Sequence, residues 1–305
     1  MTNDLQPPPA ADDVAVAIDA GGSSTRARAR SGGAVVHEGT GGPGNPVSAD
    51  LPTLRASYDA ALAGCPPADR IVACVSGTTH EPMRALIETL LAERFPGAVV
   101  RVLPDYLAPI MAAPPRTDLC IVAGTGSVVC SRDPAGGYRV TGGRGWILGD
   151  HGSATRLGRA ALEYFVADPR RVPAAFAGAV RNIAGGSDWQ TVVRAVHGVP
   201  NPAPLLARAA PLLTSAAEDQ QHWAIGLLDD QMSALARSTA WHIQQHLPGT
   251  QEVSAILSGG VWTSRAARSS FTRALERATS RAVTVSQERI DPLDGAVRLA
   301  GEIDP

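Results

Sequence analysis

The sequence contains no lysine, and all 27 basic residues of the 305-residue chain are arginines. A phosphate-binding site that depends on lysine is therefore excluded, and a phosphate here must meet arginine, a metal ion or backbone N–H groups. The formal net charge of -2 also lacks the basic excess of proteins that bind a nucleic-acid backbone. We expect no nucleic-acid partner.

Cysteines and long apolar runs are scarce as well. The chain has 4 cysteines, none in C-x-x-C spacing, which argues against a zinc ribbon or a redox pair and favours reduced thiols. No apolar run approaches membrane-spanning length, and the start MTNDLQPPPAADD has neither the basic residues nor the apolar core of a signal peptide. We expect a cytoplasmic protein with no membrane partner.

The length is about twice that of a single domain, which favours two domains. Apolar strand patterns alternate with helical ones from Val14 to about Ser153 and again from Ser254, as in an α/β protein. The residues from Ala154 to His246 instead predict a succession of helices. Residues 1–13, rich in Pro, Ala and Asp, are expected to form a disordered tail.

Three glycine turns each follow a predicted strand. Such turns let backbone N–H groups and hydroxyls approach phosphate oxygens, or let the backbone lie against an adenosine. Taken singly, each is equally consistent with an ordinary turn. The turns comprise Asp19, Gly21, Gly22, Ser23, Ser24 and Thr25 in the first, Gly124, Thr125 and Gly126 in the second, and Ser258, Gly259, Gly260 and Trp262 in the third.

A fourth string, GGRGWILGDHGSATRLG at residues 142–158, places Asp150 between glycines just before a predicted helix. There its carboxylate can accept hydrogen bonds from sugar hydroxyls or simply cap the helix, and Ser153 is a second candidate cap. Together with the order of the three turns, this string resembles the BadF/BadG/BcrA/BcrD ATPase family of the actin-like ATPase superfamily. Within that family the N-acetylglucosamine kinases are the most similar, and the resemblance runs from Val14 to about Gly301.

The resemblance implies a two-domain actin-like ATPase (ribonuclease H-like) fold with an interdomain cleft. The N-terminal domain would span residues 14–106 and the C-terminal domain residues 107–293, with the helical segment 154–246 inside it. A final helix at 294–305 would pack back on the first domain. The implied activity is ATP-dependent phosphorylation of an amino sugar, most specifically N-acetylglucosamine, at its 6-hydroxyl. Glucosamine, another hexose or a muropeptide sugar would also fit as the acceptor.

The resemblance also assigns site residues. Asp105, after the predicted strand AVVRVL, would be the catalytic base that accepts the proton of the acceptor hydroxyl. Asp19 would hold Mg²⁺ through water, the first two glycine turns would hold the ATP phosphates, and the third would hold the adenosine. The sugar would meet Asn45, Asp105, Gly145, Trp146 and Asp150, although Asn45 in GGPGNP also reads as a turn residue and Trp262 as a core residue.

One departure lies inside the fourth string, where His151 stands in place of the family's usual glutamate. An imidazole cannot replace a carboxylate acceptor, so substrate preference and activity are both open. Two alternatives share the fold: an ATPase activator with a bridging iron–sulfur cluster, for which no cysteine signature is visible, and a non-catalytic sugar sensor. We also expect Asp294 to cap the last helix and, from the resemblance, a homodimer.

Overall fold

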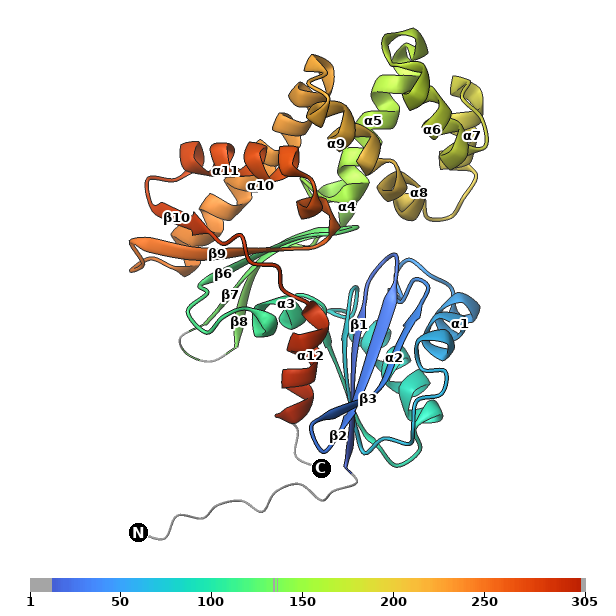
Figure 1. Ribbon diagram of the computed structural model, residues 1–305, viewed down its shortest axis with the longest axis vertical. Coiled ribbons are helices and arrows are strands. Elements are labelled where there is room, and N and C mark those ends of the chain that lie inside the picture. Colours follow the sequence, from blue (N-terminus) through green and yellow to red (C-terminus); the bar gives the residue numbers. More distant parts are fainter. Residues whose placement is uncertain (1–12, 134, 136, 303–305) are drawn as a thin grey trace. The chain divides into compact units, whose positions relative to one another are not determined.

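The computed structural model describes residues 13–133, 135 and 137–302 (Figure 1). The expected tail lies outside the described residues except for Asp13, which pairs with Arg70. The chain divides into two compact units. Unit 1 is built from the described residues up to Ala112 together with those from Asp291 onward, and unit 2 runs from Ala113 to Ile290.

Unit 1 is an α/β unit around a five-stranded sheet in the order β3-β2-β1-β4-β5. Strands β1, β2 and β3 are antiparallel, whereas β1, β4 and β5 run parallel. Helix α12 packs against α3 and β1, and α1 packs against β3. The elements are β1 Val14–Ala20, β2 Thr25–Ser31, β3 Ala34–Gly41, α1 Leu51–Ala61, β4 Arg70–Val75, α2 Glu81–Arg94, β5 Val99–Pro104, α3 Leu107–Ala112 and α12 Pro292–Gly301.

Unit 2 repeats the topology of unit 1. Its five-stranded sheet has the order β10-β9-β6-β7-β8, with β6 in the place of β1 and the same pattern of parallel and antiparallel pairs. The sequence theme of strand, glycine turn and strand is therefore a structural repeat. The strands are β6 Leu119–Ala123, β7 Ser127–Arg132, β8 Tyr138–Gly142, β9 Glu252–Ser258 and β10 Ala282–Val285.

The predicted run of helices between the strands of unit 2 is confirmed. Its members share one buried apolar core with β6 and β9. None of the described helices is long and apolar enough to cross a membrane. The helices are α4 Gly145–Leu148, α5 Ala154–Ala167, η1 Pro169–Arg171, α6 Ala174–Ala184, α7 Trp189–His197, α8 Ala203–Arg208, α9 Ala210–Glu218, α10 His222–His246, η2 Gly260–Thr263 and α11 Arg265–Ala278.

Helix α12 completes unit 1 and begins two residues earlier than expected, at Pro292 instead of Asp294. Asp291, not Asp294, is the N-cap, and its side chain accepts a hydrogen bond from the backbone N–H of Leu293. Pro292 explains the difference, because proline suits the first helical position and keeps the preceding residue extended. Asp294 lies in the first turn and instead forms an ion pair with Arg28 at 2.5 Å.

A buried histidine joins α10 to the β7–β8 hairpin of unit 2. The two ring nitrogens of His242 lie 2.8 Å from Thr141 Oγ1 and 3.0 Å from Ser131 Oγ. Burial, with a smaller contribution from the neighbouring His246, lowers the pKa of His242 to about 4. The imidazole is therefore neutral at physiological pH and acts as a hydrogen-bonded core residue.

Candidate functional site

Polar side chains gather where the parallel strands of unit 1 end. The register aligns Ala20 of β1 with Val75 of β4, and Val75 with Pro104 of β5. Asp19 lies at the end of β1, whereas Ser76 and Asp105 directly follow β4 and β5. The carboxyl ends of neighbouring parallel strands form one sheet edge, so this edge carries both predicted carboxylates.

Asp19 is paired with an arginine from the opposite strand. Arg26 faces it across the hairpin and donates a hydrogen bond from Nη2 to Asp19 Oδ2 at 2.6 Å. The same guanidinium reaches Asp291 Oδ1 through Nη1 at 2.8 Å. Burial raises the pKa of Asp19, and the pairing with Arg26 only partly offsets this. Arg26 therefore joins the strand end to the cap of α12.

A chain of hydrogen bonds ends at Asp105. Asn45 Nδ2 donates to Ser76 Oγ at 3.3 Å, and the Ser76 hydroxyl donates to the carboxylate of Asp105. Burial, followed by the nearby negative charge of Asp19, raises the pKa of the half-buried Asp105 to about 6. No ion pair to Asp105 is found among the described residues of this edge. Its carboxylate is thus held by neutral donors rather than neutralised by a cation.

The first glycine turn is fastened to the loop that carries Asn45. Gly44 N donates to Gly21 O at 2.9 Å, and Thr25 Oγ1 donates to Gly42 O at 3.0 Å. A Cβ at Gly44 would lie 2.4 Å from Thr25 Oγ1, so only glycine allows this approach. Gly21 itself has open space around its missing side chain. Asn45 also serves as a turn residue, since its Oδ1 accepts from Val47 N at 2.8 Å.

In unit 2 the second glycine turn is bound to the first turn of α5. Ala154 N donates to Gly124 O at 2.8 Å, and Thr155 Oγ1 donates to Thr125 O at 2.7 Å. Ser153 caps the helix as expected, with its side chain accepting from Arg156 N. The second glycine turn and the fourth string therefore meet. The space beside the missing side chain of Gly124 is open.

Asp150 is 9% exposed and holds an unusual backbone conformation, with φ of 51°. Backbone N–H groups of Ser127, Gly145 and Arg144 hydrogen bond to its carboxylate. Burial outweighs these donors and raises the pKa of Asp150 to about 6. Its Oδ1 is buried without a hydrogen-bond partner in the described part of the chain. Asp150 thus ties the loops together and keeps one oxygen available for a further donor.

The third glycine turn lies against the second. A Cβ on Gly259, whose φ is 109°, would lie 2.4 Å from the carbonyl oxygen of Ala123, whereas Gly260 has open space beside it. Trp262 is 5% exposed, donates from Nε1 to Ile121 O at 3.0 Å and packs against Phe271. Its ring is committed to the core, so we do not retain the expected contact between Trp262 and adenosine.

The remaining residues of the fourth string lie near the surface. Gly145 begins α4, and the Trp146 ring lies 5.8 Å below the guanidinium of Arg159. Burial lowers the pKa of His151, with help from Arg156, and its Nδ1 is buried without a partner among the residues that the structure describes. The His151 ring is therefore neutral at physiological pH and offers no replacement for a carboxylate.

The structure brings several predicted residues together within each unit and adds two that sequence reasoning missed. Unit 1 gathers Asp19, Asn45 and Asp105, and unit 2 gathers the second and third glycine turns with Asp150. Ser76 was missed because SG after a strand is a common turn signal, and Arg26 because its charge was read only as part of a strand. The pairing of β1 with β2 is the signal that finds Arg26 opposite Asp19.

Comparison with known proteins identifies the architecture. No protein-family model matches the chain, and no curated protein matches its sequence. Among solved structures, a candidate N-acetylglucosamine kinase from Chromobacterium violaceum is 26% identical, with a TM-score of 0.67 over 95% of this chain and 100% of its own. The fold is that of the actin-like ATPase sugar kinases.

Two more distant sugar kinase structures share this fold. A candidate N-acetylglucosamine kinase from Porphyromonas gingivalis is 18% identical, with a TM-score of 0.72 over 95% of this chain and 99% of its own. A ROK family glucokinase from Streptomyces griseus, solved with glucose and AMPPNP, is 15% identical, with a TM-score of 0.63 over 95% and 99% of the two chains. The sugar kinase fold therefore accounts for nearly the whole chain.

Proposed function

We propose that this chain is an ATP-dependent sugar kinase that transfers the γ-phosphate of ATP to the 6-hydroxyl of an amino sugar, most specifically N-acetylglucosamine. We also propose membership of the BadF/BadG/BcrA/BcrD ATPase family. The structural match that is 26% identical to this chain supports the choice of sugar. The position of Asp105 carries the proposal.

Asp105 has the properties of a general base. A pKa of about 6 leaves the carboxylate ionised at neutral pH yet basic enough to take a proton as the phosphoryl group arrives. Ser76 fixes one side of the carboxylate through its hydroxyl, and Asn45 in turn holds Ser76. We propose that the acceptor hydroxyl donates to Asp105, with the Asn45 amide contacting a neighbouring hydroxyl of the sugar.

The open glycines support nucleotide binding. Gly21, Gly124 and Gly260 each lie in one of the three turns, and their backbone conformations do not demand glycine. A Cβ added at any of the three would meet no other atom within 4 Å. We propose that the bare backbone at the first two turns, with Ser23, Ser24 and Thr125, meets the phosphates, and that Ser258 to Gly260 meet the adenosine.

The residues at Asp19 fit a magnesium ion that arrives with its nucleotide. No group of three or more His, Cys, Asp or Glu side chains among the described residues is arranged to hold a metal. Mg²⁺ typically takes one or two protein carboxylates and fills its other positions with water and phosphate oxygens. Asp19 would supply that carboxylate, and Mg²⁺ would neutralise charge on the β- and γ-phosphates.

On the sugar side, the unpartnered Oδ1 of Asp150 is suited to a hydroxyl donor, and we propose that it binds the sugar with Gly145 and Trp146. His151 does not contribute an anion there. The ATPase-activator alternative needs exposed paired cysteines to hold a cluster, whereas Cys65, Cys74, Cys120 and Cys130 are all buried. We further propose a cytoplasmic homodimer without nucleic-acid or membrane partners; a monomer by light scattering would remove the dimer.

ADP release measured over a panel of hexoses and amino sugars tests the proposal. We expect the wild type to turn over N-acetylglucosamine fastest and Asp105→Asn to lose about 10²–10⁴-fold in kcat. The matched control is Asp59→Asn, at an exposed carboxylate of α1, which should leave kcat unchanged. Equal, slow ADP release by wild type and Asp105→Asn with every sugar would refute the kinase proposal. The non-catalytic sugar sensor would then be the remaining alternative.

A further inference from the structure

The ion pair at Asp19 extends to the N-terminus of α12. Arg26 donates from Nη2 to Asp19 Oδ2 at 2.6 Å and lies 2.8 Å from Asp291 Oδ1 through Nη1. One guanidinium is therefore shared by two carboxylates, and the three side chains together carry one net negative charge. The second carboxylate comes from the residue that caps the last helix of the chain.

Other cations do not cancel the charge of Asp291. Arg28 Nη2 lies 3.6 Å from Asp291 Oδ2. The same guanidinium is closer to two carboxylates of its own, Glu38 at 2.6 Å and Asp294 at 2.5 Å. Asp291 therefore offsets the positive charge of Arg26 more than that of Arg28.

Asp19 keeps one carboxylate oxygen for a ligand. Its Oδ2 accepts from Arg26, whereas its Oδ1 accepts no hydrogen bond from the described residues, and the side chain is 21% exposed. Burial raises the pKa of Asp19, the pairing with Arg26 lowers it, and the negative charge of Asp291 raises it again. Arg26 thus fixes the orientation of the carboxylate, and Asp291 acts on its charge.

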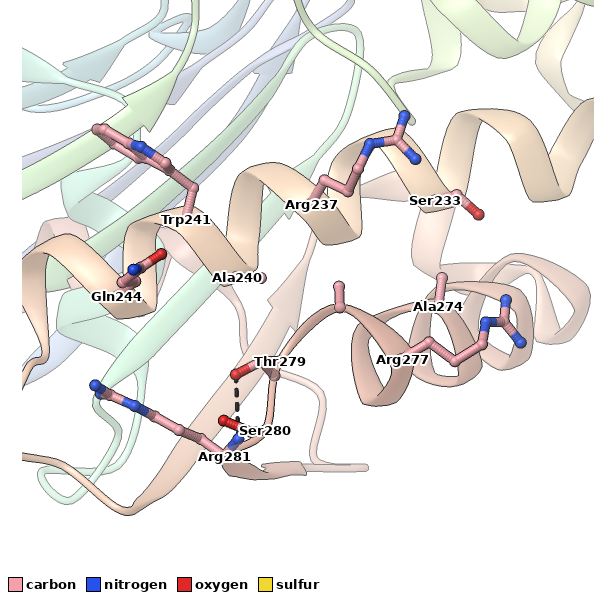
Figure 2. Close-up of a pocket in the computed structure, with 11 residues that line it drawn as sticks. Ser233, Arg237, Ala240, Trp241, Gln244, Ala274, Arg277, Thr279, Ser280 and Arg281 are labelled. Carbon is pink, nitrogen blue, oxygen red and sulfur yellow. Dashed lines mark hydrogen bonds between the residues drawn. The ribbon is translucent and has the colours of Figure 1, made fainter.

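The arginines around the cavity of unit 2 are not arranged in this way. This cavity of about 770 Å³ lies between α10 and α11 (Figure 2). The side chains of Arg237, Arg277 and Arg281 point in different directions around it. The convergence of charges on one carboxylate is therefore a particular feature of the strand end that carries Asp19.

The helix cap does not need the charge of Asp291. The cap is a hydrogen bond of 3.1 Å from Leu293 N to Asp291 Oδ1. Asparagine and serine cap helices about as well as aspartate does, because only an acceptor oxygen is required. The negative charge of Asp291 can therefore serve a second role at Arg26.

We propose that Asp291 is a positioning residue for Asp19 and acts through Arg26. The inference rests on the proposed function, in which Asp19 meets Mg²⁺ through water. Arg26 alone would cancel the charge of Asp19, and a neutral pair attracts a divalent cation only weakly. Asp291 engages the other end of the guanidinium, which restores one net negative charge and leaves Asp19 Oδ1 available.

Calorimetric titration with AMPPNP at a series of Mg²⁺ concentrations tests this inference without turnover. We expect AMPPNP to bind the wild type more tightly as the Mg²⁺ concentration rises. Asp291→Asn preserves the helix cap and removes the charge, so the Tm should stay close to that of the wild type. The Mg²⁺ concentration that gives half of the effect should rise about 10-fold.

Asp294→Asn is the matched control. Asp294 lies in the first turn of the same helix but pairs with Arg28 instead of Arg26. Its removal should leave the half-saturating Mg²⁺ concentration within about 2-fold of the wild type, because exposed charges away from the ion are screened. Equal shifts in Asp291→Asn and Asp294→Asn, or no shift in either, would overturn the role of Asp291 and leave the proposed function standing. AMPPNP binding by the wild type that does not depend on Mg²⁺ would instead refute the assignment of Asp19, and this inference with it.

A double-mutant cycle tests the route through Arg26. In an Arg26→Gln background, Asp291 has no guanidinium to engage at Asp19, so adding Asp291→Asn should change the half-saturating Mg²⁺ concentration by less than about 2-fold. A 10-fold effect of Asp291→Asn in that background would show that its charge acts on the ion directly, and would overturn the role of Arg26. The comparison of Asp291→Asn with Asp294→Asn does not depend on the folding of Arg26→Gln.

Discussion

Replacing Asp105 with asparagine should remove activity and at the same time stabilise the protein. The pKa of this carboxyl is raised from 3.8 to about 6, so ionisation is less favourable in the folded than in the unfolded chain. At pH 7 the shift of about two units corresponds to about 3 kcal/mol that the native carboxylate costs. Asparagine keeps an oxygen for the Ser76 hydroxyl but carries no charge.

Because the pKa of Asp105 is raised in the folded chain, its cost to stability appears only within a defined pH range. Below the unfolded pKa of 3.8 both states hold the proton, and the wild type bears no penalty. Stability of the wild type is then lost as the pH rises towards about 6, and the loss is constant above that. The advantage of Asp105→Asn should therefore open between pH 4 and 6 and persist at pH 7.

Thermal unfolding of the wild type, Asp105→Asn and Asp59→Asn at pH 4, 5, 6 and 7.5 measures this directly. A gain of 1 kcal/mol in the free energy of unfolding raises the Tm by about 2–4 °C in a chain of this size. The Tm of Asp105→Asn should therefore be several degrees above that of the wild type at pH 7.5 and nearly equal to it at pH 4. Asp59→Asn should follow the wild type throughout. A Tm of Asp105→Asn below that of the wild type at pH 7.5 would refute the argument that burial makes the ionised carboxylate destabilising.

Four more substitutions test the site and the core. Ser76→Ala removes a donor that lowers the pKa of Asp105, so the acidic limb of kcat/KM against pH should move to higher pH; an unmoved limb would contradict the hydrogen-bond chain. Gly260→Ala enters open space and should leave the Tm unchanged while raising the KM for ATP at least 10-fold. Gly259→Ala meets backbone at positive φ and should cost more than about 1 kcal/mol in denaturant unfolding; equal stability of the two glycine variants would be inconsistent with the described turn. His242→Leu removes the partner of the buried Ser131 hydroxyl and of the partly buried Thr141 hydroxyl and should cost about 2 kcal/mol, which urea titration would detect.

Much of the fold could be predicted because the signals are local. Strand patterns that end in glycine turns recur, and in each unit the two strands that flank the first such turn pair with each other. Asp19 and Asp105 could be assigned to strand ends from the chain alone. Their shared edge could be anticipated from parallel pairing, but the burial that raises the pKa of Asp105 comes from side chains distant in sequence.

The roles of some residues could not be predicted because the local sequence was compatible with two structures and tertiary contacts determine which one forms. Trp262 follows a glycine turn that suits either a ligand or a core, and only the carbonyl of Ile121 and the ring of Phe271 decide for the core. Asp291 and Asp294 are both plausible caps, and Pro292 decides between them. The role of Ser76 depends on Asn45, 31 residues earlier, which no local pattern encodes.

The divided construction of unit 1 has a consequence for how the protein is made. Helix α12 packs so closely on α3 that a Cβ at Gly295 would lie 1.8 Å from the carbonyl oxygen of Ala108, and Asp291 supplies the second partner of Arg26. A ribosome releases these residues only after every residue of unit 2. Unit 2 is continuous and can fold during synthesis, whereas the earlier strands of unit 1 must wait for α12. The edge that carries Asp19 and Asp105 is thus completed only after unit 2 has been made.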